Sequence, residues 1–369
     1  MKILFVDNDC PEALDDDALG RGPLGGTEAS LFRIARSLAH HRGLEVAVAQ
    51  HNRDKEAHES ETGVRYLHYS HEEGLSEQFT PDAIVVLRKY KILPRLRKRY
   101  PAAKLFLWMH CYPGKRWRNA VDILRRTQTR VVAVSDHLRD EMINLLRPQL
   151  QPWKCEHLVQ RIFNPVHVTP DSLGKGSYDP DKLVFFSSPH KGLEDVLANF
   201  AHVRRAFPSM RLVTADPGYW KGPRATGTEG VVSLGALKPD EVHREVADAL
   251  CVFYPQTWFA ETFGLVFAEA NALGTPVLAH NLGAAGQVLP LGGPDQLCDC
   301  SDPASIVERI RSWREGSRPR VSLNPAFTIE QVTWDWINLL AAGESSLIPK
   351  ARPLGELQPI RPLLAGQAA

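Results

Sequence analysis

Short apolar runs that do not alternate with polar residues set the strongest limit on the fold of this chain. Three of them occupy residues 83–87, 105–109 and 131–134, and each is followed by polar residues and a helical or basic segment. Strands of this length and composition are buried on both faces, as in a parallel sheet covered by helices. The first part of the chain is therefore expected to be an α/β domain.

The N-terminal segment contains one complete unit of this kind. A strand at residues 3–6 is followed by an acidic loop that ends at Gly25 and Gly26, by a helix with an apolar stripe over 31–38, and by a strand at 44–49. Such a crossover makes the strands parallel, and ligands bind at the carboxyl ends of parallel strands. Gly25 and Gly26 lie at that end, where they either admit a ligand to the backbone or form only a tight turn. The pair does not match the dinucleotide Gly-x-Gly-x-x-Gly fingerprint, so nicotinamide binding has no support.

Other polar residues in the first part of the chain could have either a structural or a functional role. His110 directly follows a strand, and a histidine there either packs in the interior or belongs to a site. Ser135 is expected to cap a helix. Basic residues are frequent between Arg88 and Arg130. Solvated helix surface is the simpler explanation, and a face for anionic lipid head groups, a diphosphate acceptor or nucleic acid is the alternative.

A second alternation of strands and helices follows the Pro-, Gly-, Ser- and Asp-rich segment at residues 169–181. It predicts a second parallel sheet. The expected strands lie at residues 183–186, 211–214, 231–234, 250–254 and 275–279, and the expected helices at 193–207 and 239–249.

A chain of 369 residues is long for a single core, so two domains are expected. The change near Asn164 and Pro165 divides an N-terminal Rossmann-like domain (1–165) from a C-terminal one (166–325). An amphipathic helix is expected at 326–343, and the remaining residues, 344–369, have no periodicity and are expected to be disordered.

Composition adds limits of its own. The six cysteines have no metal-type spacing, which favours free thiols in a reducing compartment. The 44 lysines and arginines balance 43 aspartates and glutamates, so net charge predicts no partner. No apolar run approaches the roughly 18 residues of a membrane-spanning helix. We expect a cytoplasmic protein whose membrane contact, if any, is peripheral and on the inner face of the membrane.

The stretch from Glu261 to Glu269 places two carboxylates around a helix start. The apolar stripe that begins at Leu265 has helical spacing, and Gly274 ends the helix. Gly264 at the helix start leaves backbone N–H groups free beside the positive end of the helix dipole, which suits a phosphate. The flanking carboxylates are suited to bind hydroxyl groups.

Together with the residues around it, this stretch resembles the donor-binding signature of glycosyltransferase family 4. The two glutamates, with seven residues between them, are followed in register by Gly274-Thr-Pro-Val and by Gly283-Ala-Ala-Gly286. Other residues fall in the expected order over most of the chain: Gly25-Gly26, His110, Asn164, Lys191-Gly192 and Leu234-Gly235. The resemblance implies a GT-B fold, in which two Rossmann-like domains face each other across a cleft.

The resemblance also implies the residues of the site. Glu261 faces the hydroxyls of the donor sugar, His110 contacts the transferred sugar, and Lys191 neutralises the diphosphate; these three form the expected catalytic group. Two negative charges develop on the leaving group, and fixed cations and helix dipoles stabilise them, so no metal ion is expected. The expected donor-binding residues are Glu269 at the ribose, Phe263, Gly264 and Leu265 through their backbone N–H groups, Thr262, Leu234, His190, Gly25 and Gly26.

The implied reaction is transfer of a sugar, with retention of anomeric configuration, from a nucleotide-diphosphate sugar to an acceptor hydroxyl. The acceptor is expected to be a glycan or a lipid-linked molecule of cell-envelope polysaccharide or glycolipid synthesis, and nucleic acid is not expected as a partner. Nothing beyond the donor substrate is expected as a cofactor. The two glutamates are not assigned the acid and nucleophile roles of a glycosidase.

One departure from the family pattern concerns the phosphate site. Members commonly carry an arginine a few residues before the lysine, whereas this chain has Ser187 and Ser188 there. Lys191, with help from His190, is then left to supply the charge. Two alternatives stay open: donor hydrolysis or epimerisation by the same fold, and a non-catalytic protein that binds a nucleotide sugar or a glycan.

Overall fold

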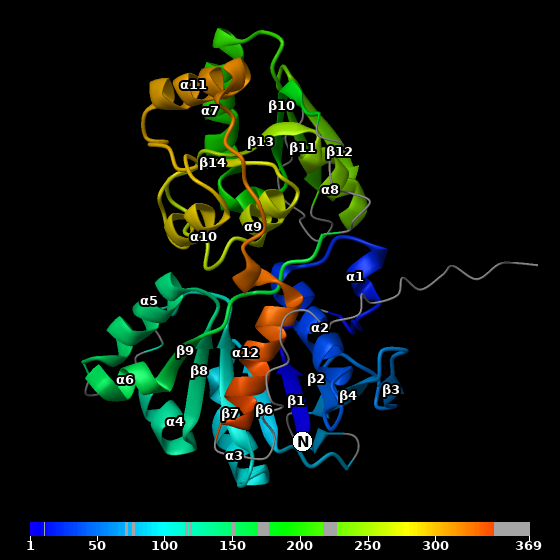
Figure 1. Cartoon of the computed structure of the whole chain (residues 1–369). Helices are drawn as coiled ribbons and strands as arrows, with labels where there is room; N and C mark the ends of the chain where they lie inside the picture. The colour runs from blue at the N-terminus through cyan, green and yellow to red at the C-terminus, as the bar shows by residue number, and fades with distance from the viewer. Residues whose placement is uncertain are drawn as a thin grey trace, which may run out of the picture.

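The computed structural model describes residues 1–342, except for 11, 71–72, 76–77, 115–116, 118–119, 149–151, 169–176 and 217–226. Two α/β domains, each built on one sheet, stack against each other in the described part of the chain (Figure 1). The tail for which the sequence predicts disorder, residues 344–369, lies outside the described residues.

The N-terminal domain is built on a sheet whose strand order is β3-β4-β2-β1-β6-β7-β8-β9, with β5 paired to β4. The pairs of β1, β2, β4, β6, β7, β8 and β9 along this order are parallel, whereas β3 and β5 are antiparallel to β4. Its strands are β1 (Lys2–Asp7), β2 (Glu45–Gln50), β3 (His58–Glu59), β4 (Val64–Ser70), β5 (Gly74–Leu75), β6 (Ala83–Leu87), β7 (Lys104–Met109), β8 (Thr129–Ala133) and β9 (Val159–Arg161). Its helices are α1 (Ala18–Arg21), α2 (Gly26–Ala39), α3 (Leu93–Arg99), α4 (Ala120–Thr127), α5 (Asp136–Leu146) and α6 (Pro152–Leu158).

The apolar runs of the sequence form the central strands of this sheet, which confirms the α/β prediction. The side chains from Ile3 to Val6 are all fully buried. Strand β4 was not predicted, because its buried residues Val64 and Tyr66 alternate with the partly exposed Arg65 and its composition is mixed. Ser135 caps α5, since its hydroxyl accepts the Leu138 N–H at 3.0 Å.

The C-terminal domain has a five-stranded parallel sheet in the order β12-β11-β10-β13-β14. The helix predicted over 239–249 ends earlier, at Ala247, because Ala249 begins the next strand. The strands are β10 (Asp179–Phe185), β11 (Arg211–Asp216), β12 (Val231–Ala236), β13 (Ala249–Tyr254) and β14 (Val277–Ala279). The helices are α7 (Leu193–Ala206), α8 (Pro239–Ala247), α9 (Leu265–Ala272), α10 (Ala285–Gly292) and α11 (Pro303–Ser312).

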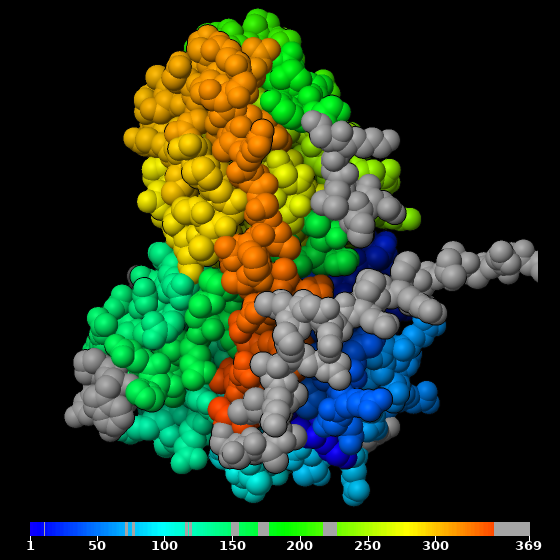
Figure 2. Space-filling model, in the orientation of Figure 1, coloured from blue at the N-terminus to red at the C-terminus, as the bar shows by residue number. Residues whose placement is uncertain are grey.

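The last described helix, α12 (Ile329–Ala341), returns to the N-terminal domain. It packs alongside α2, and Figure 1 shows it among the elements of the first half of the chain. The fully buried Trp336 lies against Trp108 and Phe5, with ring centroids 5.0 and 6.3 Å away. Figure 2 shows the orange segment before and within α12 passing from one domain onto the other. The core of the N-terminal domain is thus completed by a segment from the far end of the described chain.

The two chain segments that connect the domains lie side by side. Val166 and Thr328 form a parallel bridge, and the Val166 N–H donates to the Phe327 carbonyl at 2.8 Å. The Phe327 ring packs edge-on against Phe163 and Phe263, with centroids 4.8 and 5.1 Å away. The connection is therefore a paired crossover with an aromatic cluster beside it.

None of the described helices combines the length and the apolar composition that crossing a membrane requires.

Candidate active site

A cavity of about 240 Å³ lies between the two domains. Helix α2 of the N-terminal domain lines it with Gly26, Ala29 and Arg33. The C-terminal domain contributes polar side chains from three places along the sequence: Lys191, Glu261 and Glu269. The structure therefore brings together three of the residues for which the sequence predicts a shared site, and adds an arginine.

Gly264 sets the start of helix α9. Its φ of +82° is in the left-handed region, which glycine adopts without strain, and a Cβ at this position would overlap the Phe267 ring. The turn directs the first N–H groups of α9 away from the preceding chain, and Leu265 and Val266 of this first turn line the cavity. The first turn of α9, where the sequence predicts an anion site, therefore borders the cavity.

Helices α2 and α9 both begin at this cavity. A Cβ on Gly26 would lie 3.0 Å from Leu265 Cδ1, so the glycine allows the two helix starts to approach closely. Gly25, the residue before α2, has an ordinary φ of −62°, so left-handed backbone is not the reason for this glycine. The positive ends of two helix dipoles consequently converge on the same space, a favourable arrangement for phosphate.

Lys191 and Glu261 form an ion pair in the cavity. The Lys191 Nζ atom lies 2.8 Å from Oε1 and 3.1 Å from Oε2 of Glu261, and the Tyr254 hydroxyl donates to Oε1 at 3.0 Å. The side chain of Glu261 is 8% exposed and that of Lys191 28%. Each of these two charged groups therefore has the other as its partner within the cavity.

The loop after β13 explains how residues 70 positions apart meet. Gln256 Oε1 accepts the N–H groups of Trp258 and Phe259, which fixes the approach to Glu261. Gln256 also packs on Gly192, where a Cβ would lie 2.6 Å from Gln256 Cβ and where φ is +106°. Gly192 thus permits the loop of Glu261 to lie directly beside Lys191.

Gly283 secures the other side of the same loop. A Cβ at Gly283 would lie 2.7 Å from the Glu261 carbonyl oxygen, and Glu261 and Gly283 form a parallel bridge. The Ala284 N–H donates to the Glu261 carbonyl at 2.9 Å. The Gly-Ala-Ala-Gly segment noted in the sequence therefore positions the backbone of Glu261.

Arg33 is the site residue that the sequence analysis missed. Its Nη2 atom donates to Glu269 Oε1 at 3.1 Å, and its Nη1 atom donates to the Pro165 carbonyl at 3.1 Å. The Arg33 side chain is 12% exposed and that of Glu269 is 23% exposed. Helical spacing could have pointed to Arg33, because it follows Gly26 by two turns and therefore lies on the same face of α2.

His110 lies beside the cavity and is not one of its lining residues. The Thr262 hydroxyl donates to the His110 carbonyl at 3.0 Å, which joins the two domains. The His110 ring packs on Trp108 with centroids 4.5 Å apart, and its buried Nε2 atom has no hydrogen-bond partner. Burial, and secondarily the charge of Arg88, hold the pKa of His110 well below its usual value of 6.5.

This environment predicts a loss of stability in mild acid. Burial also lowers the pKa values of His167 and His243, so the unfolded chain binds protons below pH 6.5 that the folded chain does not. Stability is then complete above pH 6.5 and decreases as the pH falls below it. We expect His110→Gln to reduce the decrease in urea midpoint between pH 7.5 and 5.0. The same change at the exposed His40 is expected to leave the decrease unaltered; an equal effect of both variants would contradict the prediction.

The remaining predicted residues have different surroundings. The buried side chain of Phe263 belongs to the aromatic cluster at the crossover, so only its backbone is available to a ligand. Leu234 is 38% exposed on β12 and His190 is exposed beside the Phe259 ring; neither lines the cavity. Ser187 and Ser188 do line it.

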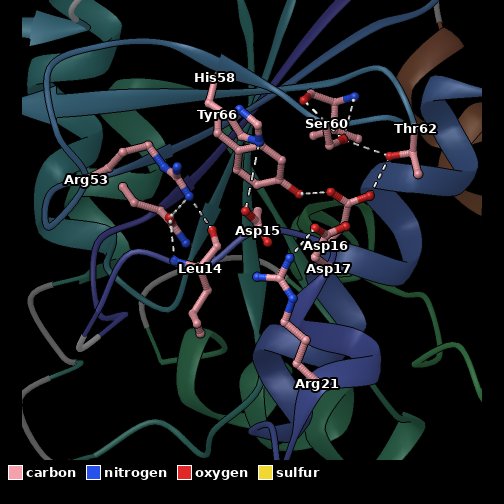
Figure 3. A network of polar contacts seen from close by, with 12 residues as sticks. Leu14, Asp15, Asp16, Asp17, Arg21, Arg53, His58, Ser60, Thr62 and Tyr66 are labelled. Carbon is pink, nitrogen blue, oxygen red and sulfur yellow. Dashed lines mark hydrogen bonds and ion pairs between the residues drawn. The ribbon is translucent and has the colours of Figure 1, made fainter.

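A buried polar network holds the acidic loop that precedes α2 (Figure 3). Asp16 is 1% exposed and accepts hydrogen bonds from the Tyr66 hydroxyl at 3.0 Å and from the Thr62 hydroxyl at 2.5 Å. Arg53 donates to the Leu14 carbonyl at 2.6 Å. The loop continues into Leu19, Pro23 and Leu24, which line the cavity. The network therefore fixes one wall of the candidate site.

Within the described part of the chain, no group of three or more His, Cys, Asp or Glu side chains has an arrangement that could hold a metal ion. All six cysteines are free, and Cys111 is the exposed one.

Comparison with known proteins identifies the C-terminal domain. Residues 175–326 match the family model of the glycosyl transferases group 1. Among curated relatives, a phosphatidyl-myo-inositol mannosyltransferase from Propionibacterium freudenreichii is 36% identical over 104 residues, 28% of this chain and 26% of the relative. A glycogen synthase from Mycobacterium tuberculosis is 27% identical over 205 residues, 51% of this chain and 46% of that enzyme. The chain thus aligns with less than half the length of these relatives.

Solved structures match over nearly the whole chain. A sucrose-phosphate synthase from Thermosynechococcus elongatus aligns with 93% of this chain and 98% of its own, at a TM-score of 0.69 and 16% identity. Anabaena Alr3699/HepE, in complex with UDP-glucose, aligns with 93% of this chain and 100% of its own, at a TM-score of 0.66 and 17% identity. These likenesses confirm the predicted GT-B fold. Residues 175–326 are therefore a domain of the glycosyl transferases group 1, and the chain that contains them has a GT-B fold.

Proposed function

We propose that this chain transfers a sugar from a nucleotide-diphosphate sugar to an acceptor hydroxyl and retains the anomeric configuration. The observation that carries the proposal is the composition of the cavity between the domains: the Lys191–Glu261 pair, Glu269 and two converging helix starts surround one space. The donor consists of a sugar, a diphosphate and a nucleoside, and the cavity offers a chemically matched group to each. Family membership and the UDP-glucose bound by the structurally similar Anabaena protein support the same class of donor.

Each group then has a defined task in the reaction. The acceptor oxygen bonds to the anomeric carbon while the bond from that carbon to the phosphate oxygen breaks, and the departing diphosphate takes the electron pair. Attack on the face of the departing diphosphate retains the configuration and lets the acceptor proton pass to a phosphate oxygen. Lys191 and the N–H groups at the start of α9 stabilise the charge that develops there, which is why we propose that no metal ion is required.

The carboxylates orient the two ends of the donor. Glu261 is proposed to accept hydrogen bonds from hydroxyls of the sugar, and Glu269 from the ribose. His110 is neutral near pH 7 because its pKa lies well below the usual value, so its ring can hydrogen-bond an uncharged hydroxyl of the transferred sugar without bringing a competing positive charge.

The acceptor side of the cleft is less basic than the sequence suggests. Arg88, at the end of β6, has carboxylate oxygens of Glu28, Asp7 and Asp9 at 3.3, 3.6 and 3.8 Å. We propose a hydroxyl acceptor from cell-envelope polysaccharide or glycolipid synthesis, a class supported by the name of the mannosyltransferase relative. A cytoplasmic location, with peripheral contact at the inner face of the membrane, belongs to the same proposal.

Donor binding and transfer can be measured in succession. We expect one member of a panel of UDP-, GDP- and ADP-sugars to raise the melting temperature, because a ligand that binds only the folded state stabilises it by mass action. With that donor and a panel of glycan and lipid-linked acceptors, we expect a product whose anomeric configuration, read by NMR, equals that of the donor. Glu261→Gln is expected to slow transfer about 100-fold or more while donor stabilisation persists.

Other outcomes contradict the proposal in distinct ways. Consumption of the donor without acceptor would identify a hydrolase or an epimerase. Donor stabilisation without turnover on any acceptor would identify a binding protein. An inverted product would contradict retention while leaving transfer intact.

A further inference from the structure

We propose that Arg33 is the second cation of the diphosphate site and that it exchanges Glu269 for the diphosphate when the donor binds. This inference rests on the proposed function and adds to it a residue from the opposite domain. Arg33 has a permanent positive charge, and it forms a direct ion pair with Glu269, the carboxylate proposed to bind the ribose.

The charge balance of the cavity supports this assignment. Two residues that line it, Lys191 and Arg33, carry a permanent positive charge. The acidic side chains that line it are Asp216, Glu261 and Glu269, and the positions before Lys191 are occupied by the uncharged Ser187 and Ser188. A nucleoside diphosphate brings at least two negative charges into this partly enclosed space. One lysine neutralises only part of that charge, so a second cation within reach has a clear electrostatic role.

The position of Arg33 puts the guanidinium within the site. Gly26 of α2 adjoins Leu265 at the start of α9, and Arg33 of α2 bonds Glu269 further along α9. Side chains on a helix lean toward its N-terminus, so Arg33 extends toward the end of α2 that adjoins the start of α9. The guanidinium therefore lines the same cavity as the two helix starts.

The two ion pairs of the cavity have the same pattern. Lys191 is bonded to Glu261, and Arg33 is bonded to Glu269. A nucleotide sugar supplies hydroxyls for both carboxylates and phosphate oxygens for both cations, so each charged side chain can exchange one partner for another. Such an exchange would keep a polar partner at each of these four side chains, which avoids the cost of isolating a partly buried charge.

If Arg33 exchanges partners in this way, its replacement should have different effects on the affinity for a nucleoside diphosphate and on the affinity for the corresponding nucleoside. Arg33→Gln removes a charged contact to the diphosphate, and such contacts contribute about 10- to 100-fold in affinity. The same change also frees Glu269 for the ribose. We therefore expect Arg33→Gln to weaken binding of the preferred nucleoside diphosphate about 10- to 100-fold, and to leave binding of the corresponding nucleoside unchanged or tighter. Arg33→Lys is expected to be intermediate, because it keeps the charge and loses the planar fork.

The control variant is Arg36→Gln, one turn further along α2. Arg36 does not line the cavity and pairs at 3.5 Å with Asp16, part of the network that holds the loop before α2. Its loss is therefore expected to affect both affinities alike and to leave their ratio unchanged. Isothermal titration calorimetry with UDP, GDP and ADP first identifies the preferred nucleoside diphosphate. Titration of that diphosphate and its nucleoside into the wild-type chain and the three variants then gives the eight affinities needed.

The outcomes separate this inference from the proposed function. If the wild-type chain binds none of the nucleoside diphosphates, the proposed function fails and this inference fails with it. If the wild type binds one of them and Arg33→Gln weakens diphosphate and nucleoside equally, Arg33 only supports the fold through Pro165, and the inference alone is overturned. Unchanged diphosphate affinity in Arg33→Gln overturns it as well.

Discussion

Replacement of Lys191 by methionine is expected to lower kcat for sugar transfer about 100- to 1,000-fold. The lysine is the cation of the C-terminal domain that lines the cavity, and negative charge on the leaving diphosphate is greatest as the glycosidic bond breaks. An interaction that strengthens in the transition state affects kcat more than KM. Initial rates over a range of donor concentrations separate the two constants.

Lys182 provides a matched control for this substitution. It is 5% exposed, lies in the same domain and pairs with Glu245 at 2.7 Å, but it is located in the middle of β10 and does not line the cavity. Lys182→Met is expected to lower stability and preserve kcat. Equal losses of kcat in the two variants would show that breaking a lysine–glutamate pair elsewhere in the domain lowers kcat just as much. That result would contradict the role assigned to Lys191.

Replacement of Trp336 by alanine is expected to destabilise the N-terminal domain by about 3–5 kcal/mol. The side chain is fully buried and has edge-on contacts with Trp108 and Phe5, so the substitution removes a large apolar surface and leaves a cavity in the core. Urea unfolding followed by far-UV circular dichroism measures the change in free energy of unfolding.

Trp334 on the same helix is the control, because it is only partly buried and contacts the His41 ring at 5.5 Å. Trp334→Ala is expected to cost about 1 kcal/mol or less. If both variants lost the same free energy, α12 would lie on the N-terminal domain as a surface helix and would not be part of its core.

The local patterns of the sequence predicted the fold because its central strands are buried on both faces. Runs such as residues 83–87 and 105–109 then read as continuous apolar segments. Strand β4 escaped detection because its sequence, Val-Arg-Tyr-Leu-His-Tyr-Ser, is neither a continuous apolar run nor a strict alternation of apolar and polar residues. Helix α10 escaped because it contains Pro290 and two glycines, which have poor helix propensity.

The candidate site was only partly predictable, for a different reason. Its helix start depends on neighbours along the chain, and Gly264 with Leu265 was visible from spacing alone. The pairing of Arg33 with Glu269 joins residues 236 positions apart, and that of Lys191 with Glu261 joins residues 70 apart. Partners at such separations are set by the docking of the two domains, which no local pattern describes.

The paired crossover has a mechanical consequence. Two adjoining tethers bridged at Val166 and Thr328 resist independent twisting more than a single tether would, so we expect them to favour a hinge rotation near the bridge. The Phe327 ring beside this bridge touches Phe263, the residue directly before the turn that starts α9. We therefore expect a pair of distance probes across the cleft to report such a rotation as a change in one distance.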